Sequence, residues 1–351
     1  MSNVKKLLRF SVLLCILSYG WACNLESKEK SIAFISVSTK EQLENVKQEA
    51  KEAGLPLLVV FFGSGWCPWS EKMAREVFSH QGFKESMEGE CLTVKIELPA
   101  KESADPSFAE LKSLAAEYDV KESPTLVLLS AEGEFIAKEG YFLLQAEGFA
   151  KHFKESFHGF KEIKEKLQSS QVSLSESLLQ QLHQKARDFG FHRLQEEIVN
   201  LGTKIAKEPF FFLEKYESLS KERKKKDLEV QALRKKILSL DPKNVKKTHL
   251  RLAMIDFTNR IDHKKSKKEP KSVVEPLISY IKQFGKNDEE NLWKIEMMVA
   301  QYFFSKKEIA SAIKHAERSL EAAPEQVKSD VMQTLIYLTS NHCLIRQSAK
   351  K

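Results

Sequence analysis

The first half of the chain alternates between short apolar runs and amphipathic stretches. Leu57–Phe62 is an unbroken apolar run, as is typical of a central strand that is covered on both faces. Before it, apolar residues recur at helical spacing after Thr39, a favourable N-cap residue, and Gly54 ends that pattern. The predicted strands are Ile32–Val37, Leu57–Phe62, Cys91–Leu98, Thr125–Leu129 and Phe135–Lys138. With the helices between them and a closing helix at Gln145–Phe157, the predicted order is βαβαβαββα.

After His158 the strand signals stop, and helical patterns follow one another between helix breakers. The breakers are Gly190, Pro209, Asp241-Pro242, Pro270, Gly285 and Pro324. Single amphipathic helices must bury their apolar stripes against neighbours, which indicates stacked helix pairs. We therefore expect an α/β domain at residues 31–157, with a mixed sheet flanked by helices, and an all-α, helical-repeat-like domain at residues 173–342.

The extreme N-terminus has the pattern of an export signal. Lys5, Lys6 and Arg9 precede an apolar stretch, Phe10–Tyr19, that is too short to cross a bilayer comfortably. We expect a cleaved signal peptide at residues 1–22 and an exported protein that is periplasmic or envelope-attached. The pair Ala22-Cys23 resembles the end of a bacterial lipoprotein signal. The alternatives are lipid attachment at Cys23, which would tether the protein to a membrane, and simple secretion.

Charge and cysteine content restrict the chemistry. The formal net charge of +7 is modest for 351 residues and does not demand a nucleic-acid partner. The five cysteines are too few and too scattered for a disulfide scaffold, and they lack metal-ligand spacing. We therefore expect no metal and no cofactor.

The segment after Leu57–Phe62 carries the candidate chemistry. Cys67 precedes Pro68, which suits a first helical turn, so the thiol is placed at a helix N-terminus where partial positive charge favours the thiolate. A thiolate is the nucleophile of disulfide exchange. Trp66 and Trp69 flank the cysteine with apolar surface on which a peptide could rest.

This segment resembles the thioredoxin-like domains of exported bacterial proteins, the thiol–disulfide interchange family. Trp66-Cys67-Pro68-Trp69 followed by Lys72, Met73, Arg75 and Glu76-Val77-Phe78 is similar to that family's active-site helix. Ser123-Pro124-Thr125 is similar to the family's loop in which a cis-proline faces the cysteine. Glu132-Gly133-Glu134 and Gly140-Tyr141 match its final hairpin and the segment after it. The resemblance implies a thioredoxin fold, and a substrate groove formed by Trp66, Pro68, Trp69, Ser123 and Pro124.

The departure from the family is at Ser70, which stands where the second, resolving cysteine is expected. A serine hydroxyl cannot attack a mixed disulfide, although it can hydrogen-bond the Cys67 thiolate. The buried acid that thioredoxins keep near the end of the central strand is missing too, since Val60 and Phe61 stand there. Cys91 is a poor substitute, because the start of the following parallel strand lies at the opposite end from Cys67.

The helical part carries a second resemblance. Residues from Trp293 to Pro324 weakly resemble a tetratricopeptide repeat, with Ala300, Phe303, Ala312 and Pro324 at its small, aromatic, small and proline positions. This resemblance implies binding of peptides or proteins along a concave face. The alternative is a plain helical domain.

Two functional hypotheses follow. In the first, the chain is a monothiol protein with Cys67 and Ser70 as catalytic residues. It would act as a thiol–disulfide oxidoreductase or isomerase without a resolving cysteine, on client proteins with thiols or disulfides, and together with a redox partner protein. In the second, it is a non-catalytic adaptor or chaperone-like binder that uses its helical repeats.

Overall fold

The computed structural model describes residues 34–100, 106–169, 174–222, 227–262 and 269–348. The predicted signal peptide and Cys23 lie outside these residues, as does the side chain of Cys343. The chain divides into two compact units. Unit 1 contains the described residues up to 169 together with Gln184–Leu194, and unit 2 contains Leu174–His183 and the residues from Gln195 onward.

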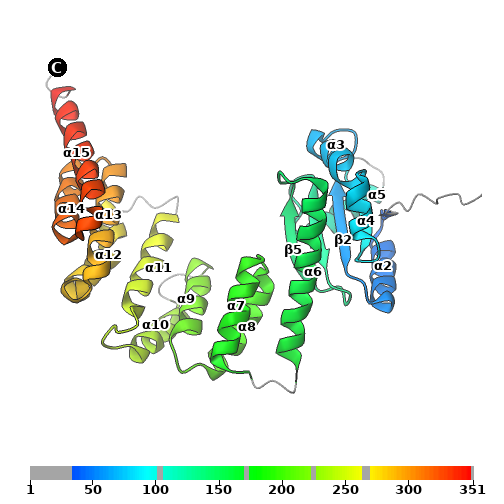
Figure 1. Cartoon of the computed structure of the whole chain (residues 1–351), viewed down its shortest axis with the longest axis horizontal. Helices are drawn as coiled ribbons and strands as arrows, with labels where there is room; N and C mark the ends of the chain where they lie inside the picture. Colours follow the sequence, from blue (N-terminus) through cyan, green and yellow to red (C-terminus); the bar gives the residue numbers. More distant parts are fainter. Residues whose placement is uncertain (1–33, 101–105, 170–173, 223–226, 263–268, 349–351) are drawn as a thin grey trace, which may run out of the picture. The chain divides into compact units, whose positions relative to one another are not determined.

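Unit 1 is built on a mixed five-stranded sheet (Figure 1). Its strands are β1 (Ile35–Ser36), β2 (Leu57–Phe62), β3 (Leu92–Glu97), β4 (Thr125–Leu129) and β5 (Phe135–Gly140). The order across the sheet is β1-β3-β2-β4-β5; β3 is parallel to β1 and β2, whereas β4 is antiparallel to β2 and β5. Every residue of β2 is buried, as its unbroken apolar run predicts.

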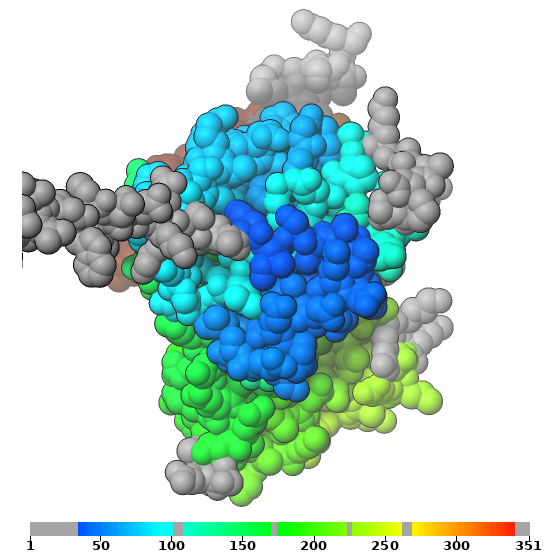
Figure 2. All heavy atoms as spheres, turned by 90° about the vertical axis from the view of Figure 1, so that its right-hand side faces the viewer, coloured from blue at the N-terminus to red at the C-terminus, as the bar shows by residue number. Residues whose placement is uncertain are grey.

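Helices lie along the sheet in the predicted order. They are α2 (Lys40–Ala53), α3 (Pro68–Met73), a π-helical segment η1 (Ala74–Phe78), α4 (Gln81–Met87), α5 (Pro106–Glu117) and α6 (Ala146–Gln168). Thr39 forms a full capping box with Gln42, which confirms it as an N-cap. In Figure 2 the darkest blue segment, which includes α2, lies on the face toward the viewer, in keeping with its polar outer positions.

Two details of unit 1 differ from the sequence-based expectation. The region after Cys67 contains α3, η1 and a separate α4 rather than one helix. The closing helix does not end at Phe157 but continues to Gln168, because its apolar stripe continues through Phe160 and Ile163, both buried.

The rest of the described chain is helical, so the predicted fold class of an α/β fold followed by an all-α region is confirmed. These helices are α7 (Glu176–Asp188), α8 (His192–Ile205), α9 (Phe210–Glu222), α10 (Leu228–Leu240), α11 (Thr248–Asp262), α12 (Pro270–Phe284), η2 (Gly285–Asn287), α13 (Glu289–Ser305), α14 (Ile309–Ala322) and α15 (Glu325–Ser348). From α9 to α15, consecutive helices pack against one another, as α13 and α14 do, and bury their apolar stripes in shared cores. The packing of neighbouring helices expected from the periodicity is therefore present in this part of the chain.

Candidate functional site

The loop that joins β2 to α3 places the cysteine. Cys67 is the N-cap residue of α3 and has Pro68 at the first helical position, as predicted. Its backbone N–H donates to the Gly63 carbonyl at 2.9 Å, which closes the loop. A Cβ on Gly63 would lie 2.7 Å from Cys67 Cβ and 2.7 Å from the Trp66 ring. Only glycine allows this close approach, so Gly63 brings the tryptophan and the thiol together.

The cysteine faces the loop before β4. The Cys67 thiol donates to the Ser123 carbonyl, with 3.0 Å between sulfur and oxygen, and the Ser123-Pro124 peptide bond is cis, which confirms that prediction. The sheet explains the proximity, since Phe61 near the end of β2 pairs with Thr125 at the start of β4. Cys67 is only 7% exposed, and among the described residues the buried Ser123 hydroxyl has no hydrogen-bond partner.

Ser70 lies in the first turn of α3 and is 1% exposed. Its oxygen accepts a hydrogen bond from the Gly63 N–H at 3.0 Å. That bond uses the hydroxyl as an acceptor, so its own proton stays available for donation. Glu71 supports the same loop from the next position, since its carboxylate accepts from the Gly65 N–H at 2.9 Å. The serine thus holds the loop that carries the thiol.

Two exposed tryptophans flank Cys67 in the sequence. Trp66 is 44% exposed, and its indole N–H donates to the Leu98 carbonyl at 2.8 Å. Trp69 is 55% exposed and packs against Tyr141, with 5.7 Å between the ring centroids. The Lys72 ammonium lies 5.5 Å from the Trp69 ring and 5.8 Å from that of Tyr141. Sequence reasoning matched Tyr141 to a family segment but gave it no part in the groove.

Leu143 and Leu144, which follow Tyr141 in the sequence, are both exposed. Sequence analysis missed both. The signal was an apolar run, Tyr141–Leu144, placed after a strand where a polar turn is usual.

Cys91 lies where the sequence argument put it. The strand register pairs Leu92 with Leu57 at the start of β2, whereas Cys67 follows Phe62 at the other end. Burial raises the pKa of the Cys91 thiol to about 12, although a contact with Thr93 opposes this. A thiol with such a pKa stays protonated and inert at physiological pH.

In the described parts of the chain, no group of three or more histidine, cysteine or acidic side chains could hold a metal ion. Within the same residues, no helix is both long enough and apolar enough to cross a membrane.

Comparison with known proteins agrees with the geometry. Residues 43–156 match the family described as a thioredoxin-like domain. Over 343 residues the chain is 30% identical to the thioredoxin-related protein DsbJ of Chlamydia pneumoniae, and the match covers 96% of each protein. The chain belongs to this thioredoxin-related DsbJ family. The family membership and the thioredoxin-like fold expected from the motifs are thereby confirmed.

Other relatives match a smaller share of the chain. The disulfide bond reductase DsbH of Chlamydia pneumoniae is 31% identical over 105 residues, which is 30% of this chain and 61% of DsbH. A solved structure titled DsbH Oxidoreductase has 21% identity and a TM-score of 0.33, and covers 40% of this chain and 98% of its own. Membership in the DsbJ family supports a function related to thiols and disulfides.

Proposed function

We propose that the chain is an exported monothiol protein that engages client thiols and disulfides through Cys67. The observation that carries the proposal is the position of Cys67 at the start of α3, where its thiol contacts the carbonyl before cis-Pro124. Pro68, Ser123 and Pro124 would shape the groove, and Trp66 and Trp69 would provide its apolar walls.

The proposed reaction begins when the Cys67 thiol loses its proton to solvent. The thiolate attacks one sulfur of a client disulfide, so a Cys67–client disulfide forms and the other client sulfur leaves as a thiolate. In isomerisation, that or another client thiolate attacks the mixed disulfide, forms a new client disulfide and releases Cys67, with no net oxidation. For net reduction, a thiol of a redox partner protein or a small external thiol must release Cys67, because Ser70 cannot.

Client binding and thiol release are coupled in this proposal. In the free protein the thiol proton is held by the Ser123 carbonyl. A client backbone N–H that donates to this carbonyl would displace the thiol, and the unpartnered Ser123 hydroxyl offers a second polar contact. The Ser70 proton would then stabilise the thiolate.

The name of one relative supports the choice of clients. DsbH is named a disulfide bond reductase, which is consistent with protein thiols and disulfides as the targets here. We further propose that residues 1–22 are a signal peptide and that the mature protein is periplasmic or attached to the envelope through Cys23. We also propose a thioredoxin-like domain at 31–157 and a tetratricopeptide-like domain at 173–342 that selects clients.

The test is capture of a defined client. The reduced full chain is mixed with a protein whose disulfides have been scrambled, and adducts are counted on non-reducing gels. We expect mixed disulfides with the wild type and with Cys91→Ala, but none with Cys67→Ala. If wild type and Cys67→Ala give the same result, the monothiol proposal is wrong.

The low exposure of Cys67, 7%, favours a second candidate, a non-catalytic adaptor. An adaptor would bind clients through the exposed aromatic surface without covalent chemistry. Alkylation of Cys67 separates the two, since it abolishes exchange but leaves an adaptor's binding to a thiol-free client intact.

A further inference from the structure

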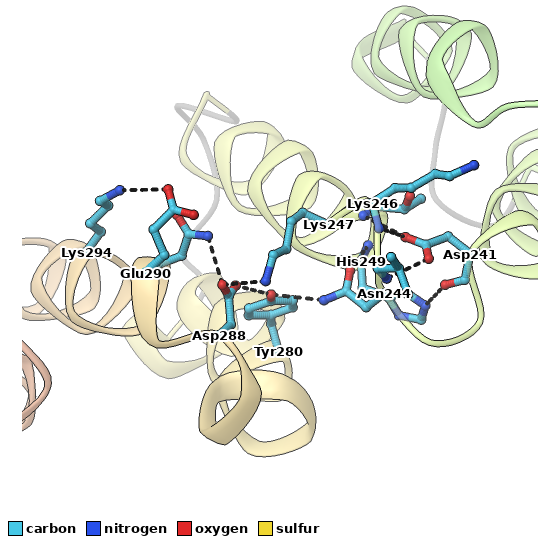
Figure 3. Close-up of polar contacts among 12 residues, drawn as sticks. Asp241, Asn244, Lys246, Lys247, His249, Tyr280, Asp288, Glu290 and Lys294 are labelled. Carbon is cyan, nitrogen blue, oxygen red and sulfur yellow. Dashed lines mark hydrogen bonds and ion pairs between the residues drawn. The ribbon is translucent and has the colours of Figure 1, made fainter.

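Polar contacts brace both units, and in unit 2 the charges around one pocket neutralise one another. This pocket of 540 Å³ lies between α9 and α11, and its cations Lys246, Lys247 and Arg251 are each ion-paired with a carboxylate. The buried Asp241 carboxylate accepts from the backbone N–H groups of Val245 and Lys246, at 2.8 and 3.0 Å, and so fixes the turn that carries the lysines (Figure 3). These contacts stabilise unit 2.

In unit 1 an ion pair joins α6 to the end of β5. His152 in α6 places its Nε2 atom 2.9 Å from each oxygen of the Glu139 carboxylate in β5. Both side chains are partly buried, with 35% of the histidine and 17% of the glutamate exposed. Glu139 is next to last in β5, so the pair ties the end of this strand to the helix.

The end of β5 lies next to the proline loop. Gly140, the last residue of β5, pairs with Thr125 of β4, and Thr125 follows cis-Pro124. Tyr141 comes directly after Gly140, and its ring centroid lies 5.7 Å from that of Trp69 in α3. The strand that the ion pair holds therefore places Tyr141 beside the active-site helix.

Aromatic contacts connect the histidine to Tyr141. The Phe142 ring lies 5.3 Å from that of His152, edge to face, and 4.5 Å from that of Phe149. Phe149 is fully buried and stacks on Tyr141, with 6.1 Å between the ring centroids and 21° between their planes. Centroid distances of about 4.5–7 Å are typical of favourable aromatic pairs. A change at His152 therefore acts on rings that pack against Tyr141.

The strength of this ion pair depends on pH. The hydrogen bond to Glu139 raises the pKa of His152, partial burial opposes the rise, and the charges of Glu139 and Glu155 add to it. Glu139 faces the histidine from β5 and Glu155 from the following turn of α6, while the segment after β5 faces it with the uncharged Phe142 ring. Deprotonation leaves a neutral hydrogen bond and removes the ionic attraction. The attachment of β5 to α6 thus weakens as pH rises through the raised value.

We propose that the His152–Glu139 pair is a pH-dependent clamp that positions Tyr141 as a wall of the client groove. While His152 is charged, Tyr141 is held beside the exposed Trp69, and the two rings receive an apolar side chain next to the client cysteine. When His152 is neutral, Tyr141 is held less firmly and such clients bind more weakly. This role rests on the proposed function, since it assigns a client preference to the same groove.

Fluorescence anisotropy with the full chain carrying Cys67→Ala tests the clamp without any exchange step. The probe is a short labelled peptide with serine in place of the client cysteine and phenylalanine on both sides of it. A matched peptide carries glutamine in place of phenylalanine. We expect the phenylalanine peptide to bind saturably, and roughly threefold more weakly at about pH 9 than at about pH 6, because the ionic attraction is then lost. The glutamine peptide should bind weakly at both pH values.

Substitutions at the pair locate the effect. His152→Gln should bind the phenylalanine peptide roughly threefold more weakly than its parent at about pH 6, and equally well at about pH 9, where the parent's histidine is neutral too. Equal binding at the higher pH also shows that the variant is folded. Glu139→Gln should behave in the same way, and combining the two substitutions should add nothing. The control His158→Gln, an exposed histidine of α6 that lies 3.6 Å from Glu90, should keep the full pH dependence.

The outcomes that overturn the clamp differ from those that overturn exchange. If His152→Gln weakens binding equally at both pH values, the pair has only a structural role. Loss of the pH dependence in His158→Gln, the same pH dependence with the glutamine peptide, or absence of saturable binding would also overturn the clamp. Failure of client capture by Cys67, with the expected peptide binding intact, would instead remove the exchange function and leave Tyr141 as a wall of a non-covalent binding groove.

Discussion

Replacing Ser70 with cysteine tests whether this serine stands in the place of a resolving cysteine. Two effects are expected, a loss of stability in the reduced protein and a gain in turnover. The Ser70 oxygen accepts from the Gly63 N–H at 3.0 Å in a site that is 1% exposed. Sulfur is a weak acceptor, so in the reduced variant this buried N–H loses most of its hydrogen bond. An unsatisfied buried donor costs about 1–3 kcal/mol, so we expect the free energy of unfolding of reduced Ser70→Cys to fall by that amount.

The gain comes from proximity. Positions 67 and 70 are three residues apart around the first turn of α3, where side chains are neighbours, so the new thiol is poised to attack any mixed disulfide on Cys67. An internal thiol acts at an effective concentration far above that of an external one. We expect turnover in reduction of a model protein disulfide to rise roughly tenfold or more, with mixed disulfides vanishing from non-reducing gels.

Two measurements check this reasoning. Urea unfolding under reducing conditions gives the stability loss, and a turbidity assay with a dithiol reductant gives turnover. Ser79→Cys, an exposed serine after η1, is the matched control and should change neither. Wild-type turnover equal to that of Ser70→Cys would refute the assignment of position 70 as the place of the resolving cysteine.

Three further outcomes follow from the structure. Gly63→Ala should lower the free energy of unfolding by about 1–3 kcal/mol and shift tryptophan fluorescence, because the added Cβ would lie 2.7 Å from neighbouring side-chain atoms. The control Gly140→Ala, with open space around it, should have little effect, and equal effects of the two variants would contradict the packing argument. The hydrogen bond that His152 donates to the Glu139 carboxylate raises the pKa of His152, so the stabilisation from this pair is complete below about pH 6.5 and is lost as pH rises through the raised value. Urea unfolding at several pH values should show the advantage of wild type over His152→Gln shrinking with rising pH, and a constant difference would count against it. Cys91 should resist alkylation in the native protein at mildly alkaline pH, as checked by peptide mapping, since its pKa is raised to about 12.

The sequence predicted most of unit 1 because its signals are local. The buried run of β2, the Thr39 cap and Pro68 at a first helical turn each depend on a few neighbouring residues, and all three are confirmed. The division into α3, η1 and α4 was not predicted. Ser70, Met73, Val77 and Phe78 are buried at the spacing of a regular amphipathic helix, so the local pattern carries no signal for the π-helical segment.

The parts of the site that sequence reasoning missed depend on long-range contacts. Nothing local indicates that Tyr141 packs on Trp69, or that Ser70 binds the Gly63 N–H rather than serving only as a replaced cysteine. The pocket between α9 and α11 in unit 2 was not predicted for the same reason, since its lining comes from three helices and the turns before two of them. Local motifs identify the reactive residues, but the side chains that line the sites come from segments far apart in the sequence.

The pairing of Phe61 with Thr125 has a mechanical consequence. Cys67 follows β2 and cis-Pro124 precedes β4, and these two strands are neighbours in one hydrogen-bonded ladder. The sheet therefore fixes the spacing between the thiol and the proline loop. We expect this spacing to be the same whether or not a client is bound, so a client of the proposed exchange reaction would have to enter as an extended, locally unfolded segment. Substitutions at the exposed Trp66 and Trp69 would then change the preference among clients without changing the spacing between Cys67 and the proline loop.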